Sequence, residues 1–200
     1  MYQFVRIVLF MVLSLCPLIF ILRHYPHNRK AKTLGIAVVF AAAVITLISA
    51  AYPIENLFVS FQTPEDAFEY RTHLTAEHVI YGQDSSMVFG RKANEPLAEF
   101  VIPRSESGWK LGSDNDLSIC YGMRPFDGFY ITVERFRDTD DYYISILDST
   151  QTDKNITDKN GTSFFKGYQD KDSCSYYAYV NRFDMDYYII VNGVQIKMNK

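Results

Sequence analysis

Two short motifs of this 200-residue chain match the residue types that acyl-transferring serine enzymes use. Ser107-Gly108-Trp109-Lys110 fits S-x-x-K and Ser113-Asp114-Asn115 fits S-D-N, two signatures of penicillin-interacting enzymes. That chemistry requires the serine and the lysine one helical turn apart, whereas the stretch "SGWKLG" is typical of a turn followed by a strand. The third signature, K-T-G, is absent from the sequence. The two motifs therefore do not predict this enzyme.

The segment Thr152–Thr162 is rich in oxygen-bearing side chains and is a candidate for calcium binding. An EF-hand loop needs acidic or amide ligands at positions 1, 3 and 5 before its glycine, and a glutamate at position 12. Counting from Gly161 places Ile156 at position 1 and Gly167 at position 12, and neither offers a side-chain oxygen. We therefore expect a solvated loop at this segment.

Beyond the first 52 residues, histidines and acidic residues lie close together in the sequence at one place only. This cluster consists of Glu69, His73, Glu77 and His78. Their spacing crosses the end of a predicted helix, so no common face is assured. We predict no catalytic residue, no metal site and no cofactor from the sequence.

Cys120 and Cys174 are the only cysteines beyond the first 52 residues. In an oxidising compartment they could form a disulfide that closes a long loop, which would stabilise the fold by about 3–4 kcal/mol. Two buried free thiols are the alternative, because sequence does not show whether their Cα atoms come within bonding range.

Adjacent tyrosines occur three times in segments that are predicted to be strands. They are Tyr142-Tyr143, Tyr176-Tyr177 and Tyr187-Tyr188. Neighbours in a strand point to opposite faces, so one tyrosine of each pair should reach an outer face or a second packed layer. An exposed row would be a binding surface for a peptide, a glycan or an envelope protein. Cross-strand packing of the rings is the alternative.

Charge divides the chain into two unlike parts. Residues 1–52 hold five of the 20 Lys and Arg and none of the 23 Asp and Glu. Within this part, Phe4–Leu22 and Leu34–Tyr52 are long apolar runs, each close to the ~20 residues that a helix needs to cross a bilayer. We predict a two-helix transmembrane hairpin over 1–52, with helices at about 4–22 and 34–52 and the lipid bilayer as partner.

The loop at 23–33 sets the predicted topology, because it carries four cationic side chains and no acid. They are Arg23, Arg29, Lys30 and Lys32. Short basic loops stay cytoplasmic, so both termini should be extracytoplasmic in a multi-pass protein of the cell membrane. The remaining residues are acidic overall, which excludes nucleic acid as a partner.

The rest of the chain is predicted to be a connector at 53–62 followed by a β-rich domain over 63–200. Thr63, Pro64 and Asp66 fit the start of one short helix. From Glu77 the pattern has period two, and Asn192-Gly193 predicts a tight hairpin turn. The expected fold class is membrane-anchored α+β, with a mostly antiparallel β domain.

Two near copies, "DYYISI" from Asp141 and "DYYIIV" from Asp186, each follow a V-x-R-F stretch. We interpret each copy as the return strand of a hairpin whose outgoing strand ends in V-x-R-F. The spacing from valine to aspartate differs by two residues between the copies, and a loop tip tolerates such a difference.

The apolar start, "FQTPEDAFEY" at 61–70 and "GWKL" at 108–111 resemble small uncharacterised two-helix membrane-anchored proteins of Gram-positive bacteria. The resemblance implies a bacterial cell membrane and an outward-facing domain, and it brings no activity with it. Our first hypothesis is a membrane-anchored extracytoplasmic binding, sensing or accessory domain. A cell-envelope enzyme whose site assembles only in three dimensions, and a small subunit of a larger membrane complex, are the alternatives.

Overall fold

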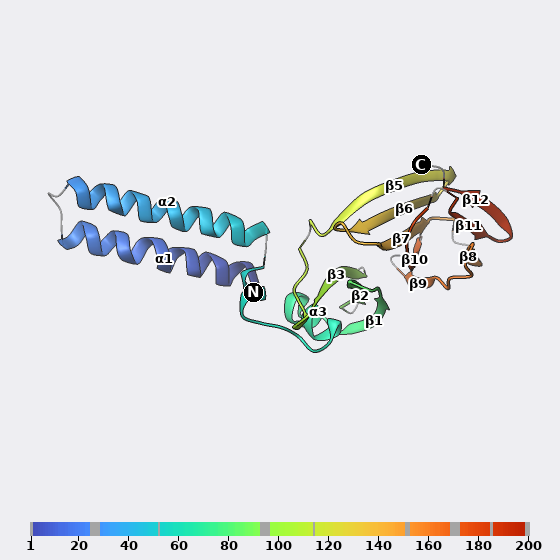
Figure 1. The fold of residues 1–200 in the computed structure, drawn as a ribbon, viewed down its shortest axis with the longest axis horizontal. Helices are drawn as coiled ribbons and strands as arrows, with labels where there is room; N and C mark the ends of the chain where they lie inside the picture. Colours follow the sequence, from blue (N-terminus) through green and yellow to red (C-terminus); the bar gives the residue numbers. More distant parts are fainter. Residues whose placement is uncertain are drawn as a thin grey trace. The chain divides into compact units, whose positions relative to one another are not determined.

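The computed structural model describes residues 2–24, 29–51, 53–92, 97–113, 115–150, 153–168, 173–184 and 186–198. The chain divides into two compact units, Met1–Leu57 and Phe58–Lys200. Figure 1 shows the helices of the first unit and the strands of the second.

The first unit is a pair of helices, α1 (Tyr2–His24) and α2 (Arg29–Ala51), followed by a short 3₁₀ helix (Ile54–Leu57). The two long helices lie side by side (Figure 1). Gly35 allows this approach, because a Cβ there would lie 3.3 Å from Leu18 Cδ1. Ala42 and Ser14 are almost completely buried. The pair is therefore held by small residues at close range.

The prediction of a transmembrane hairpin is contradicted. Among the residues that the structure describes, neither α1 nor α2 provides a helical stretch with the length and apolar character that crossing a bilayer requires. The membrane-anchored fold class, the multi-pass cell-membrane localisation and the extracytoplasmic termini are corrected with it.

The basic residues predicted to form the loop at 23–33 lie largely within helix. Arg23 is in the last turn of α1, and Arg29, Lys30 and Lys32 belong to the first turn of α2. Arg and Lys are good helix formers, so both helices extend beyond the apolar runs that were used to bound them.

Described side chains on both long helices include several that are apolar and exposed. Ile36 and Phe40 are each 70% exposed, and Ile19 and Phe20 are 59% and 58% exposed. Apolar patches of this kind are surfaces that associate with another apolar surface.

The second unit begins with helix α3 (Pro64–Thr72), whose predicted start is confirmed. The Thr63 hydroxyl accepts a hydrogen bond from the Asp66 amide at 3.2 Å, and Pro64 occupies the first turn. The helix ends at His73, which takes a left-handed conformation and donates its amide to the Glu69 carbonyl. Its buried Ala67 and Phe68 lie on the side that meets β1 to β3.

The strands of the described residues form three antiparallel sheets, which confirms the predicted antiparallel β structure. The four-stranded sheet has the order β1 (Ala76–Tyr81), β2 (Ser85–Gly90), β3 (Ala98–Ser105), β4 (Gly108–Trp109). The five-stranded sheet has the order β5 (Leu117–Phe126), β6 (Phe129–Phe136), β7 (Asp141–Asp148), β10 (Cys174–Asn181), β9 (Phe165–Tyr168). The three-stranded sheet has the order β12 (Val194–Lys197), β11 (Tyr188–Val191), β8 (Ile156–Asp158).

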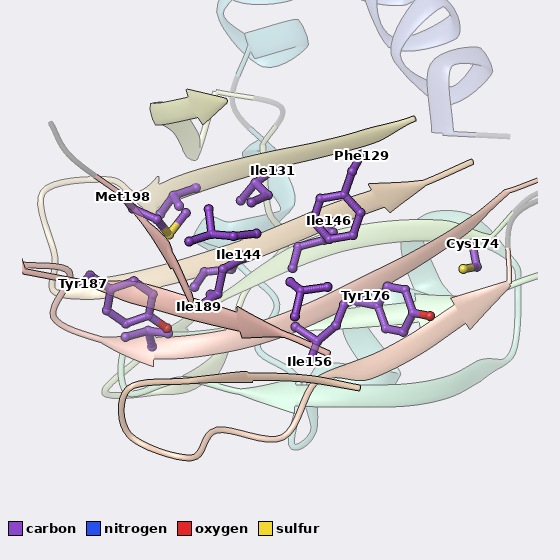
Figure 2. Packing of buried hydrophobic residues seen from close by; sticks show 14 residues of the cluster. Phe129, Ile131, Ile144, Ile146, Ile156, Cys174, Tyr176, Tyr187, Ile189 and Met198 are labelled. Carbon is purple, nitrogen blue, oxygen red and sulfur yellow. The ribbon is translucent and has the colours of Figure 1, made fainter. Parts of the chain in front are cut away.

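Hydrophobic clusters cover both faces of the five-stranded sheet. One cluster joins Ile131, Ile144 and Tyr176 of that sheet to Ile156 and Ile189 of the three-stranded sheet. Figure 2 shows these side chains between the strands, with Tyr187 and Tyr176 toward opposite ends. The second cluster joins the other face to the four-stranded sheet. Its members include Met87, Phe89, Val101, Phe136, Tyr143 and Tyr177. The five-stranded sheet is therefore the middle of three layers.

The Asn192-Gly193 hairpin turn is confirmed. Asn192 has φ 50° and Gly193 has φ 83°, and β11 and β12 pair directly across them. The prediction of two equivalent V-x-R-F hairpins is right for one copy only. β6 and β7 pair as expected, but β10 and β11 belong to different sheets. Arg182 takes φ 72°, which ends β10 and carries the chain from the middle layer to the three-stranded sheet.

Candidate functional site

The two cysteines outside the helical unit do not form a disulfide and are not brought together. Cys120 lies on β5 and Cys174 on β10, with β6 and β7 between them. Three interstrand spacings of ~4.8 Å exceed the ~7 Å limit on the Cα separation of a disulfide. The Cys120 thiol donates to the Val133 carbonyl at 3.3 Å, within its own hairpin.

The six tyrosines proposed as a binding surface are mostly inside the fold. Tyr143, Tyr176, Tyr177 and Tyr187 are each no more than 3% exposed. Tyr142 is half-buried, with its ring 5.8 Å from that of Phe183. Tyr188 is half-buried on β11. The outward tyrosine of each pair is covered because a further sheet or loop packs on that face, so the tyrosines do not form one exposed row.

The S-x-x-K residues are connected through a third side chain rather than on a helix. Ser107 lies in the turn between β3 and β4, and its hydroxyl accepts from Ser60 at 3.2 Å. The Lys110 ammonium donates to Ser60 Oγ at 2.8 Å and to the Val59 carbonyl at 2.9 Å. An ammonium that donates to two oxygens fastens the segment at Val59 and Ser60 to the end of β4.

The oxygen-rich loop is organised by Asp158, whose side chain is 2% exposed. Its carboxylate accepts from the Tyr187 hydroxyl at 2.6 Å, from the Thr162 amide at 2.7 Å and hydroxyl at 2.7 Å, and from the Asn160 amide at 2.8 Å. Burial acts to raise the pKa of Asp158, and these hydrogen bonds outweigh it, so the pKa lies below its ordinary value. The loop is therefore held by one satisfied carboxylate.

The candidate histidines are separated in the structure. His73 ends α3, whereas His78 on β1 stacks on Phe165 with ring centroids 3.8 Å apart. Burial lowers the pKa of His78. Over the described residues, no group of three or more His, Cys, Asp and Glu is arranged to hold a metal ion.

Sequence reasoning missed the buried polar network around Asp141, the first residue of β7. Its carboxylate accepts from the amides of Gln83 and Asp84 at 3.1 and 2.8 Å, and from the hydroxyls of Ser85 and Tyr179 at 2.9 Å each. The turn between β1 and β2 is thereby fixed to the middle sheet. No signal in the sequence links positions that lie 56 to 58 residues apart along the chain.

A cavity of about 720 Å³ opens between β8 and β9. Its lining residues are mostly polar: Asp153, Lys154, Asn155, Ile156, Thr157, Ser163, Phe164, Lys166, Tyr176 and Asn192. This volume lies within the range of ligand sites, and its walls combine hydroxyls, amides and ammonium groups with two aromatic rings. Tyr176 is the only proposed tyrosine that lines it.

Hydrogen bonds fix the floor of this cavity. The Tyr176 hydroxyl accepts from the Lys154 amide at 3.2 Å, and the Asn155 amide donates to Asn192 Oδ1 at 2.8 Å. The Lys154 ammonium donates to Thr150 Oγ1 at 2.9 Å and lies 3.9 Å from Asp148 Oδ2. These groups are in place before any ligand arrives.

The rim of the cavity is accessible and charged. Lys166 forms an ion pair with Asp153, and their side chains are 45% and 88% exposed. Proximity to Asp153, chiefly through its hydrogen bond, raises the pKa of Lys166 and the same bond lowers the pKa of Asp153. An exposed pair of this kind contributes little to stability, so either partner is available to a ligand.

Two sheet edges border the cavity. β8 pairs only with β11 and β9 pairs only with β10, so the outer edge of each strand has no strand partner among the described residues. An edge of this kind presents backbone amides and carbonyls at the spacing of an extended chain.

Comparison of the sequence with protein-family models and with curated proteins, and of the fold with solved structures, found no match. The resemblance to small membrane-anchored proteins of Gram-positive bacteria stays a prediction.

Proposed function

We propose that the unit Phe58–Lys200 is a binding domain that takes an extended peptide segment into the cavity between β8 and β9. The observation that carries this proposal is a pair of strand edges, without strand partners among the described residues, along one preformed polar cavity. A peptide that adds to such an edge gains main-chain hydrogen bonds, and the pockets beside the edge select its side chains.

The charges at the cavity favour a peptide with an acidic side chain or a free carboxylate. Lys166 stands at the rim beside the aromatic ring of Tyr176, with its ammonium 6.0 Å from the ring centroid. A ligand carboxylate can replace the exposed Asp153 as its partner. The fixed amides and hydroxyls of the floor can then form hydrogen bonds with the backbone of the ligand.

The test is selection of short peptides on the immobilised full-length protein, followed by titration of selected peptides in solution. Acidic peptides should be enriched, and Lys166→Gln should weaken their binding by about tenfold, as the loss of one charge-assisted contact predicts. Lys197→Gln removes the same charge from β12 at the opposite edge of the three-stranded sheet, and it should leave affinity unchanged.

Backbone chemistry supplies the second arm of the test. The same peptides with N-methyl groups at alternate residues keep their side chains but cannot donate to a strand edge. They should bind at least tenfold more weakly. Equal binding of the methylated peptides, or no enrichment of peptides at all, would overturn the proposal.

A further inference from the structure

The opposite face of the middle sheet holds a second, smaller cavity of about 160 Å³. Tyr176 and Tyr177 are neighbours in β10, and they line different cavities because they point to opposite faces. The second cavity is built on two adjacent cross-strand rows. Thr132, Ser145 and Tyr177 form one row, and Tyr130, Leu147 and Ser175 form the other. The six positions come from β6, β7 and β10.

The cavity exists because the four-stranded sheet covers only part of this face. Tyr143 and Tyr177 are 1% and 2% exposed beneath that sheet, whereas Tyr130 and Leu147 are 41% and 42% exposed. Glu99 of β3 stands where the covering ends and lines the cavity. The cavity is therefore lined by hydroxyls and apolar surface, with one carboxylate at its edge.

The Glu99 carboxylate at the cavity lies near a second carboxylate, that of Glu134, which does not line the cavity itself. Among the described residues, no Lys, Arg or His forms an ion pair with Glu99 or Glu134, which follows two residues after Thr132. Desolvation raises the pKa of Glu99 although part of its side chain stays accessible, and a hydrogen bond with Tyr177 partly offsets the effect. Desolvation and then the charge of Glu99 raise the pKa of Glu134. A bound positive charge would relieve both effects.

A second observation points to a polar ligand. Ser175 is 3% exposed and lines the cavity, and within the described parts of the chain no group forms a hydrogen bond with its hydroxyl. Thr132 and Ser145 add further hydroxyls to the same wall. A largely buried hydroxyl is normally hydrogen-bonded, so the Ser175 hydroxyl can accept from a ligand that donates, with the half-buried hydroxyls of Thr132 and Ser145 beside it.

We propose that this second cavity binds a primary ammonium group, carried by a small amine or by a lysine side chain of a partner. An ammonium is a compact charge with three donors, which suits one carboxylate and two hydroxyls around a small space. Its methylene stem packs on the exposed rings and methyls of Tyr130 and Leu147. A volume near 150 Å³ holds a ligand of about benzene size, so a short alkyl stem fits.

The test is titration of the full-length protein with n-butylammonium, followed through the backbone amide signals of Thr132, Ser145 and Ser175. These signals should shift and saturate. The neutral isostere n-butanol should bind at least tenfold more weakly, because it lacks the charge. Equal shifts with both probes, or shifts that do not saturate, would overturn the proposal.

Matched variants locate the site. Glu99→Gln should weaken n-butylammonium binding at least tenfold, and Glu134→Gln about threefold. Glu106→Gln removes one charge from the exposed turn between β3 and β4 and should change nothing. If Glu99→Gln does not fold, Ser175→Ala replaces it as the diagnostic variant, with an expected weakening of about threefold. Unchanged affinity in every cavity variant would refute the site.

A lysine flanked by acetyl and methylamide groups distinguishes the two sources of the ammonium. Binding as tight as that of n-butylammonium supports a lysine side chain of a partner, and binding of the free amine alone supports a small amine. Neither measurement depends on the cavity between β8 and β9, so Lys166→Gln should leave n-butylammonium binding intact.

Discussion

Asp141 and Asp158 are buried carboxylates that hydroxyls and amides satisfy, and each ties together segments from different sheets or loops. Asp141 fixes the turn between β1 and β2 to β7, and Asp158 fixes the loop after β8 to Tyr187. Desolvation raises the pKa of Tyr187, and its hydrogen bond to Asp158 raises it further. The Tyr179 hydroxyl donates to Asp141, and the Tyr187 hydroxyl donates to Asp158.

Replacement of Asp141 should be strongly destabilising. Asp141→Ala leaves two amides and two hydroxyls without their acceptor in a buried place, which should cost on the order of 3–5 kcal/mol of unfolding free energy. Asp140→Ala is the matched control, because its side chain is exposed one position earlier. Urea unfolding measures both. Losses of equal size would show that the network is not what holds this turn.

Asp158 should make stability depend on pH in the acid range. Its pKa is lowered in the folded chain, so its contribution is complete above the ordinary aspartate value of about 3.9 and is lost as pH falls through the folded value. The unfolding free energy of the native protein should therefore drop more steeply between about pH 5 and pH 2 than that of Asp158→Asn. Parallel pH profiles of the two proteins would contradict this assignment.

At the scale of elements, the sequence predicted caps and turns correctly, but it did not predict which sheet each strand joins. The Thr63 cap and the Asn192-Gly193 turn depend on neighbours a few residues away, and both were predicted. The second V-x-R-F stretch was interpreted as half of a hairpin. Arg182 turns the chain there through a left-handed conformation, which an arginine in the sequence does not predict. The following strand, β11, pairs with β8 and β12. The choice of sheet is settled by packing across layers.

The turn between β11 and β12 allows a test of backbone strain alone. A Cβ on Gly193 would meet no atom within 4 Å, so substitution there costs only the strain of φ 83°. Gly193→Val should lower the unfolding free energy by about 1–2 kcal/mol. Gly193→Asn should cost less than half of that, since asparagine tolerates the left-handed region. Thermal unfolding measures both, and equal losses would mean that the turn has another conformation.

At the scale of the whole molecule, the antiparallel β structure and the short helix were predictable, and the three layers were not. Period-two patterns locate strands, but they do not say that both faces of β7 and β10 are covered. The covering of both faces is why the tyrosine pairs are buried rather than exposed. Tyr143 and Tyr177 pack under one sheet, and Tyr176 packs under another. Neither cavity was predicted, because each depends on where a covering sheet ends. Glu99 and Lys166 have no motif around them that would have marked them.

The division into two units predicts that the β-rich unit folds by itself. A fragment of residues 58–200 should unfold cooperatively in urea, because its sheets and both hydrophobic clusters lie within it. A fragment that begins at 76 lacks α3 and with it Phe68, which is completely buried, and should lose at least ~3–5 kcal/mol of unfolding free energy. Circular dichroism follows both transitions. A gradual transition in the longer fragment would show that residues 1–57 are needed to complete the fold, and equal midpoints would show that α3 contributes no packing.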